Sequence, residues 1–113
     1  MEKLNVAIAD DNERIVQLLE NIVKSDKDLE VVGKAGNGEE IVNIIKQKEP
    51  DVVLLDIVMP VMNGFEVLKY MSVNHMLEQI PVIMISSEDS QSSIRSAYEL
   101  GAADYISRPY DAR

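Results

Sequence analysis

The 113-residue chain contains no cysteine and only one histidine, His75. Without cysteine it cannot form disulfides, thiolate metal sites or a cysteine nucleophile. A single histidine also excludes a metal centre built from several imidazole ligands. Any metal ligands must therefore come from oxygen-bearing groups, chiefly carboxylates and backbone carbonyls.

Basic residues and long apolar runs are scarce as well. Eleven Lys and Arg stand against 20 Asp and Glu, which gives a net charge of −9. An acidic surface repels phosphate backbones, so we expect no direct nucleic-acid binding by this domain. Apolar runs such as Val52–Leu55 and Val82–Ile85 fall far short of the roughly 20 residues of a membrane span. The first residues include no apolar segment of signal-peptide length. We therefore expect a cytoplasmic domain without membrane contact.

The apolar residues, 46% of the chain, alternate between two patterns along a length that suits one domain. Short continuous runs predict strands, and they lie at Leu4–Ala9, Leu29–Ala35, Val52–Leu55, Ile80–Ile85 and Ala103–Ser107. Helical spacing follows each of the first four runs, around Ile15–Val23, Ile41–Ile45, Phe65–Met71 and Ile94–Tyr98. We expect Pro50 to end the second helix and Gly101 to cap the fourth.

Repeated strand–helix units predict an α/β fold, a doubly wound five-stranded parallel sheet with helices on both faces. In such sheets, functional sites form at the carboxyl ends of the strands. Polar residues follow these ends: Asp10 and Asp11, Asp56, Ser86 and Ser87, and Ser107-Arg108-Pro109. Each alone is explained as an ordinary turn or cap residue. Their shared edge favours a site for the set.

Three carboxylates without histidine or cysteine favour a hard cation, and Mg²⁺ fits best because it needs few protein ligands. Without a cation the carboxylates would repel one another. A metal beside a hydroxyl and a fixed positive charge can hold a phosphoryl group. Asp56 follows the most apolar strand and is the expected nucleophile, which would form an acyl phosphate.

Other motifs have plainer interpretations. Gly36-Asn37-Gly38 begins like a dinucleotide-binding fingerprint, but Ile41 stands where the third glycine belongs, so we expect a turn. The methionines Met59, Met62 and Met84 lie among apolar neighbours and are expected to pack in the core. Glu39 and Glu40 suit the first turn of the second helix. Tyr105 is either a half-buried strand residue or part of the site.

Over nearly its whole length the sequence resembles the receiver domains of two-component response regulators. The matching segments are Ala9–Asn12, Leu55–Pro60 with Asn63-Gly64, Val82–Ser87, and Leu100–Tyr105 before Arg108-Pro109. The first two-thirds are most similar to the receiver of the stage-zero sporulation regulator. The resemblance implies a flavodoxin- or CheY-like sheet of strand order 2-1-3-4-5.

The resemblance also implies a role for each site residue. Asp56 would accept phosphate from a histidine kinase or phosphotransferase, and Asp10, Asp11 and the backbone carbonyl of Val58 would complete the protein ligands of Mg²⁺. Ser86 would bind the phosphoryl oxygen, and Tyr105 would turn inward when Ser86 moves. Arg108 would contact the phosphoryl group, and the bond before Pro109 would be cis. The fourth helix and fifth strand would face a linked or separate output domain.

Two departures from the family pattern stand out. The family has lysine where this chain has Arg108, and the planar guanidinium differs from an ammonium point charge. Receivers also have a fifth helix after the fifth strand, and that helix is missing from residues 1–113. We expect a receiver domain truncated before its last helix, without its output domain. Apolar surface exposed there would invite dimerisation.

Three classes of function follow. The leading one is a phosphorylation-controlled switch that catalyses only its own phosphorylation and dephosphorylation. An alternative is a non-phosphorylated pseudo-receiver acting as a protein-interaction module, which Arg108 and the missing helix favour and the intact aspartates oppose. The third is an independent phosphohydrolase, but the adjacent acids Asp10-Asp11 and the lack of room for a cap argue against it.

Overall fold

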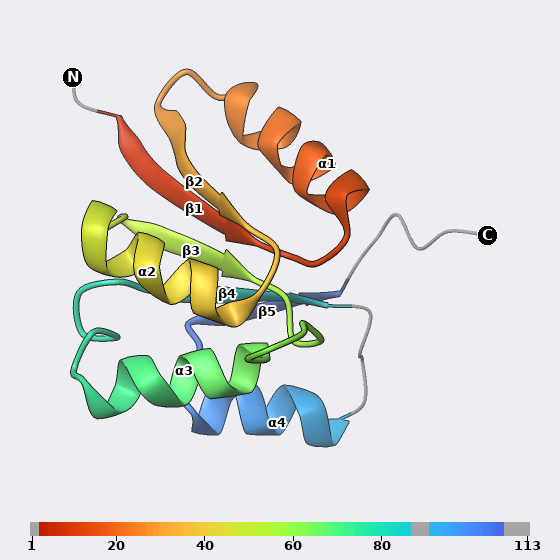
Figure 1. Cartoon of the computed structure of the whole chain (residues 1–113), viewed down its shortest axis with the longest axis vertical. Helices are drawn as coiled ribbons and strands as arrows, with labels where there is room; N and C mark the ends of the chain where they lie inside the picture. The colour runs from red at the N-terminus through yellow and green to blue at the C-terminus, as the bar shows by residue number, and fades with distance from the viewer. Residues whose placement is uncertain (1–2, 87–90, 108–113) are drawn as a thin grey trace.

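The computed structural model describes residues 3–86 and 91–107, in which five strands alternate with four helices (Figure 1). The strands are β1 Leu4–Ala9, β2 Leu29–Ala35, β3 Val52–Leu55, β4 Val82–Ser86 and β5 Asp104–Ser107. The helices are α1 Glu13–Lys24, α2 Gly38–Lys48, α3 Gly64–Val73 and α4 Gln91–Glu99. No helix within these described ranges has the length and apolar character that crossing a membrane requires.

All five strands are parallel, in the order β2-β1-β3-β4-β5. The predicted α/β class and the strand order are therefore confirmed. The register pairs Ala9 with Leu55, Leu55 with Met84, and Ser86 with Ser107. The polar residues that follow β1, β3 and β4 consequently meet at one edge of the sheet, as parallel strands require.

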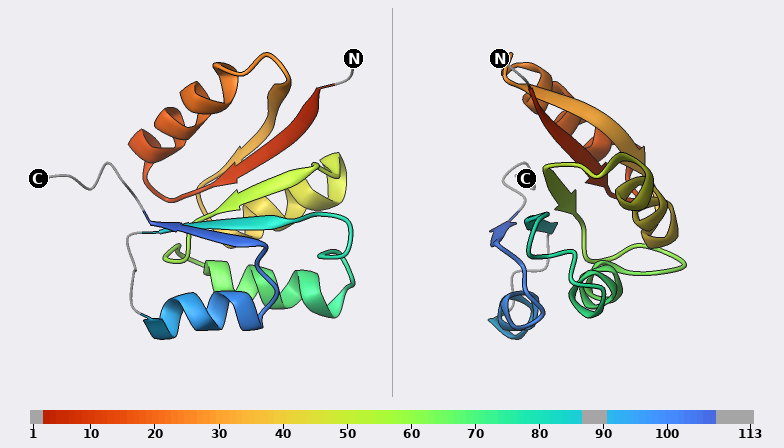
Figure 2. Two further views of the ribbon diagram at one scale, coloured as in Figure 1. Left: turned by 180° about the vertical axis from the view of Figure 1, so that it is seen from behind. Right: turned by 90° about the vertical axis from the view of Figure 1, so that its left-hand side faces the viewer.

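Alternating side chains send apolar residues to both faces of the sheet. Ala7 and Ala9 of β1 join the core under α2, α3 and α4, whereas Val6 and Ile8 join the core under α1. Figure 2 shows this unequal covering, with α1 on one side of the sheet and the other helices opposite. On the same face as α1, but at the far edge of the sheet, Ile106 of β5 is 44% exposed. Part of this second face is thus uncovered by the described residues.

Three asparagines begin the first three helices. The side chains of Asn12, Asn37 and Asn63 each accept a hydrogen bond from a backbone N–H of the first turn. Asn63 and Glu66 form a reciprocal capping box. Since Asn37 is a helix cap, Gly36-Asn37-Gly38 is a turn into α2, as predicted. Glu39 and Glu40 lie in its first turn.

Some sequence-based boundaries were wrong by a few residues. The fourth strand begins at Val82 rather than Ile80, because the Ile80 N–H bonds the Met76 carbonyl in the turn after α3. It also runs one residue further, to Ser86. The prediction for Gly101 is confirmed, since its φ of +109° is the left-handed conformation that glycine adopts after a helix.

Helix α2 ends at Lys48, and Glu49 follows in a left-handed conformation with φ of 46°. This conformation costs an L-residue about 1 kcal/mol, which glycine does not pay. We expect Glu49→Gly to raise the free energy of unfolding by about 0.5–1 kcal/mol, measured by urea denaturation. The matched control is Lys48→Gly inside the helix, which should lower stability by a similar amount. Destabilisation by Glu49→Gly would contradict this interpretation.

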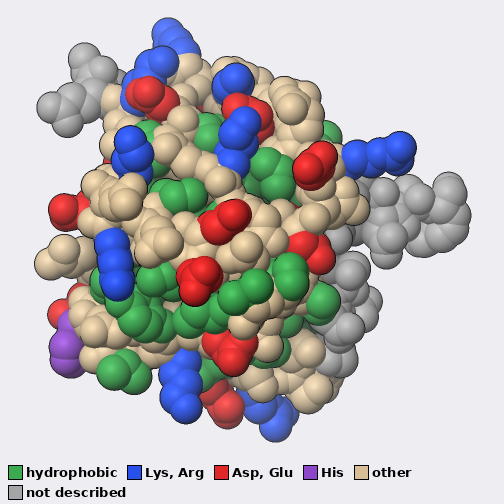
Figure 3. Space-filling view, viewed as in Figure 1, with side chains coloured by type: hydrophobic (Ala, Val, Ile, Leu, Met, Phe, Trp, Pro, Cys, Tyr) green, Lys and Arg blue, Asp and Glu red, His purple; other side chains and the backbone are tan. Residues whose placement is uncertain are grey.

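Helices α2 and α3 also share an outer surface. Figure 3 shows hydrophobic side chains forming a band across this face of the molecule, where Figure 1 draws the two helices.

Met59 and Met84 are buried in the core and Met62 packs against it, as predicted for the methionines.

Candidate functional site

Three carboxylates meet at the carboxyl edge of the sheet. Asp10 and Asp11 follow β1, Asp56 follows β3, and one carboxylate oxygen from each lies within 4.8 Å of the others. Asp10 and Asp56 are only 2% and 4% exposed, whereas Asp11 is exposed. The structure therefore brings together the three aspartates that the sequence analysis singled out, with an open side at Asp11.

Backbone hydrogen bonds hold the two buried aspartates in place. The Asp10 N–H bonds the Ala35 carbonyl, and the Asp56 N–H bonds the Ala9 carbonyl, which extends the sheet pairing to both residues. One oxygen of each carboxylate is fixed as well: Asp10 Oδ1 accepts from the Asn12 N–H at 2.9 Å, and Asp56 Oδ1 accepts from the Ile57 N–H at 2.8 Å. These contacts set the side-chain directions before any ligand arrives.

The donor set fits a hard divalent cation. Carboxylate oxygens are the ligands that Mg²⁺ prefers, and it retains several waters when few protein ligands are available. The exposed Asp11 leaves a side open to solvent, where waters and a phosphoryl group have access. Two buried carboxylates so close together carry a repulsion that a cation would neutralise.

Ser86 and Tyr105 lie on the neighbouring strands of the same edge. Ser86 ends β4 and is 1% exposed, and Tyr105 is half-buried in β5. Tyr105 pairs with Met84, two residues before Ser86, so Ser86 and Tyr105 share one face of the sheet. This is the face covered by α4, and Tyr105 packs against its core.

The loop from Asp56 to α3 folds back beneath the site. The Gly64 N–H donates to the Ile57 carbonyl at 2.8 Å. A Cβ on Gly64 would lie 2.2 Å from the Asp56 carbonyl oxygen, a separation that no real contact allows. Within the loop, the Met62 N–H bonds the Pro60 carbonyl around Val61, whose φ is +69°, a strained γ-turn for a β-branched residue. The Val58 side chain is 60% exposed.

Asn63-Gly64 belongs to the motif that resembles receiver domains, but this close approach was not predicted. An Asn-Gly pair before a helical pattern is the available signal for it, because only glycine lets two backbones touch. Arg108 and Pro109, predicted to contact the phosphoryl group and to follow a cis bond, lie outside the described residues. Their roles stay predictions.

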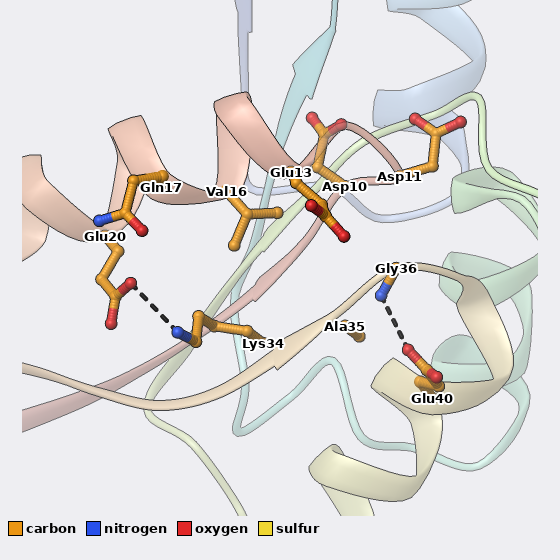
Figure 4. A pocket seen from close by; sticks show the side chains of 10 residues that line it. All are labelled: Asp10, Asp11, Glu13, Val16, Gln17, Glu20, Lys34, Ala35, Gly36 and Glu40. Carbon is orange, nitrogen blue, oxygen red and sulfur yellow. Dashed lines mark hydrogen bonds and ion pairs between the residues drawn. The ribbon is translucent and has the colours of Figure 1, made fainter.

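A pocket of about 460 Å³ adjoins the aspartates between α1, β2 and the start of α2 (Figure 4). Asp10 and Asp11 stand at one end, and Glu20 and Lys34 at the other. Glu20, with a side chain only 10% exposed, pairs with Lys34 at 3.2 Å and Lys24 at 3.3 Å. The hydrogen bond from Lys34, with that from Lys24, holds the pKa of Glu20 below its usual value.

This ion-pair group was not predicted. Its only signal in the sequence was the i,i+4 spacing of Glu20 and Lys24, which is common on exposed helices. The contact with Lys34 depends on how α1 packs on β2, so the periodic pattern could not reveal it. The ion pairs of Glu20 hold α1 against the edge strand β2. They lie at the end of the pocket away from Asp10 and Asp11.

Comparison with known proteins gives a family match over most of the chain. The model of the response regulator receiver domain matches residues 6–113. A protein-glutamate methylesterase/protein-glutamine glutaminase of Clostridium acetobutylicum is 41% identical over 112 residues, which cover 96% of this chain and 32% of the relative. The chain thus spans about a third of the length of the curated relatives it matches.

Two solved structures have the same fold. The signal receiver domain of the putative response regulator NarL from Mycobacterium tuberculosis superposes with a TM-score of 0.90 at 29% identity, covering 95% of this chain and 85% of that one. The CheX-CheY-BeF3-Mg²⁺ complex from Borrelia burgdorferi superposes with a TM-score of 0.87 at 32% identity, and the match covers 96% of this chain and 80% of that one. Neither these structures nor the methylesterase supports the finer likeness to the sporulation regulator, which stays a prediction.

Proposed function

This chain belongs to the response regulator receiver domain family of two-component signalling, and we propose that its Asp56 accepts the phosphoryl group. The donor would be the phosphohistidine of a histidine kinase or phosphotransferase. The phosphorus–nitrogen bond of the donor breaks as a phosphorus–oxygen bond to Asp56 forms. The observation that carries this proposal is the convergence of Asp10, Asp11 and Asp56 within 4.8 Å.

Each side chain would have a distinct task. Asp10, Asp11 and Asp56, with the Val58 carbonyl, would hold Mg²⁺, which supplies charge neutralisation for the transferring group. Asp56 is the best nucleophile because it follows the buried strand β3 and its carboxylate converges with those of Asp10 and Asp11, while its Oδ1 is held by the Ile57 N–H. Ser86 and Arg108 would contact the phosphoryl oxygens. The proposed cis bond before Pro109 would shape the loop that carries Arg108.

The readout would pass from Ser86 to Tyr105 and on to α4 and β5. Tyr98 of α4 donates a hydrogen bond to Asp104 Oδ1 at 3.2 Å, and the same oxygen accepts the Tyr105 N–H at 2.8 Å. Partial burial of its ring, together with Asp104, raises the pKa of Tyr98 and keeps its hydroxyl a donor. A movement of Tyr105 would therefore reach the surface of α4, where an output domain can read it.

A methylesterase is the output that the comparisons favour. The relative from Clostridium acetobutylicum carries that activity, and its match to this chain covers a third of its length. We place this chain as the regulatory domain of a longer protein, in the cytoplasm where its phosphodonors act.

The expectation of a fifth helix is supported by the exposed Ile106 and by the half-buried Val52, Leu54 and Ile83 on the face that α1 covers in part. Without it, this face would favour self-association of the isolated chain.

Phosphorylation by a small-molecule donor tests the function. The chain is incubated with phosphoramidate and Mg²⁺, and its intact mass is measured. We expect a gain of one phosphoryl group that disappears with EDTA and in Asp56→Asn. Absence of both a mass gain and Mg²⁺ binding would favour the pseudo-receiver, whereas Mg²⁺ binding without a mass gain would point to Arg108. A gain that persists in Asp56→Asn would put the phosphoryl group on another residue and contradict the proposal. Multiple turnover of the donor at a rate unlike that of acyl-phosphate decay would favour a phosphohydrolase.

Val58 is expected to prolong the phosphorylated state. Its exposed side chain stands two residues beyond Asp56 and has no polar group that could orient an attacking water. We expect Val58→Asn to shorten the phosphoryl lifetime on the order of tenfold, less than the roughly 10²–10³ that a donor aimed directly at the developing charge contributes. The lifetime is followed by intact mass after the donor is removed.

Val61→Asn is the matched control, since Val61 is 75% exposed in the same loop but lies farther along the chain from Asp56. Its lifetime should equal that of the unmodified chain. Equal lifetimes for Val58→Asn and the unmodified chain would show that the polar group is irrelevant.

A further inference from the structure

The outer surface where α2 and α3 meet, here called the α2–α3 seam, carries exposed apolar side chains. Val61 at its site end is 75% exposed, and Val73 at its far end is 68% exposed. Between them, Met62 and Tyr70 are half-buried. Figure 3 shows an apolar band over the region of these two helices, with acidic and basic side chains along its borders. Contiguous apolar surface of this kind is uncommon on a monomer unless something covers it.

Charges of opposite sign border the two ends of the seam. Glu39 and Glu66 lie in the first turns of α2 and α3, near the functional site. Lys46 lies in the last turn of α2, and its ammonium stands 5.5 Å from the centre of the Tyr70 ring on α3. Glu39 and Lys46 are two turns apart and therefore share one side of α2, about 10 Å from each other. On this side of α2, Glu39 therefore lies at the site end of the seam and Lys46 at the far end, where Glu49 lines the same pocket as Lys46.

A second copy of the chain is the occupant that this pattern fits. If two seams pack antiparallel about a two-fold axis, Glu39 of each copy faces Lys46 of the other. The interface then contains two such pairs. The same arrangement sets Val61 of one copy against Val73 of the other. Such an interface is isologous, because one patch complements itself. A parallel arrangement would instead oppose like charges at both ends.

We infer that the α2–α3 seam is a homodimer interface in which Glu39 pairs with Lys46 across a two-fold axis. The seam lies between α2 and α3, and neither β5 nor α4, which packs against α3, contributes a residue to it. The proposed output surface is therefore not part of the interface. It also does not depend on Asp56 chemistry. Its failure and the failure of phosphoryl transfer can therefore be told apart.

Charge exchange on the full 113-residue chain tests the inference by sedimentation equilibrium. Glu39→Lys opposes two lysine pairs across the axis, and Lys46→Glu opposes two glutamate pairs. We expect each single variant to raise the dimer dissociation constant at least about tenfold, because opposed like charges are costly at an interface. The double variant, and an equimolar mixture of the two single variants, should restore association to within about threefold of the original.

Ile106→Lys suppresses association through the partly uncovered sheet face that includes Ile106, and in its background the Glu39→Lys and Lys46→Glu exchanges should change the dissociation constant by the same factors as in the original chain. Circular dichroism confirms that each variant is folded. A monomer at all concentrations would overturn the inference, as would single variants that associate normally. Loss of association in Ile106→Lys would assign the interface to the sheet face instead. Failure of both the double variant and the mixture to associate would exclude the antiparallel pairing.

Discussion

Gly64→Ala is expected to lower the free energy of unfolding by about 2–4 kcal/mol, the cost of forcing a methyl group into a closed backbone contact. The added Cβ would lie 2.2 Å from the Asp56 carbonyl oxygen and 2.9 Å from the Ile57 Cα. Both are backbone atoms that no rotamer change can move. Relief therefore requires the loop to shift, and the loop carries Asp56 and the Val58 carbonyl. We expect weaker Mg²⁺ binding together with the lost stability.

Gly36→Ala is the matched control for this change. At Gly36 the nearest atom to a new Cβ is Glu40 Oε1 at 3.9 Å, an ordinary contact. Its N–H, which bonds Glu40, is retained by alanine. We expect stability within about 0.5 kcal/mol of the original and unchanged Mg²⁺ binding. Urea denaturation and Mg²⁺ titration measure both quantities. Equal free energies of unfolding for the two variants would show that the loop after Asp56 accommodates the added methyl group without a loss of stability.

Asp10→Asn should stabilise the metal-free protein and remove its response to Mg²⁺. Asp10 is 2% exposed, and its carboxylate lies within 4.8 Å of those of Asp11 and Asp56. At an effective dielectric constant near 20, two charges at such a distance repel by about 3 kcal/mol. Because Asp11 is exposed to solvent, its share of the repulsion on Asp10 is smaller. We expect a net gain of about 1–2 kcal/mol, or a rise in Tm of roughly 4–8 °C, in EDTA.

The same substitution takes away one of the proposed Mg²⁺ ligands. For the unmodified chain, Mg²⁺ should raise Tm progressively with its concentration, since it binds the folded state. For Asp10→Asn this rise should be nearly absent. Asp28→Asn, an exposed aspartate far along the chain from the site, is the control for a general loss of one negative charge. A lower Tm for Asp10→Asn in EDTA, or an intact response to Mg²⁺, would contradict the metal site.

The sequence was sufficient to predict the features that depend on local periodicity. Runs such as Val52–Leu55 are buried on both faces of a parallel sheet, so their strands could be identified without the structure. Parallel strands share a carboxyl edge, and this alone predicted that Asp10, Asp11 and Asp56 converge. The resemblance to a known family supplied the strand order, which comparison and structure then confirmed.

Other features depend on contacts between distant segments, which no periodic pattern contains. The pairing of Glu20 with Lys34 requires a particular packing of α1 on β2. The close approach of Gly64 to Asp56 requires the loop to fold back. The positive φ angles of Glu49 and Val61 occur at residues that usually avoid them. In each case the tertiary structure overrides the local preference of the residue.

The pocket beside the aspartates illustrates how the fold surrounds the site. Its walls come from α1, β2 and α2, which meet only because β2 lies at the edge next to β1. Glu20 with its two lysines closes the far end, and the acidic residues Glu13 and Glu40 line the rest. This environment should draw cations toward the three aspartates, in agreement with the proposed Mg²⁺ site.

Locating the phosphorylated residue tests the central proposal most directly. The chain is treated with phosphoramidate and Mg²⁺, reduced with borohydride to convert any aspartyl phosphate to homoserine, digested and sequenced by mass spectrometry. Our account predicts homoserine at position 56, present only when donor and Mg²⁺ are both supplied. Homoserine at position 10 or 11, or at no position despite Mg²⁺ binding, would contradict it.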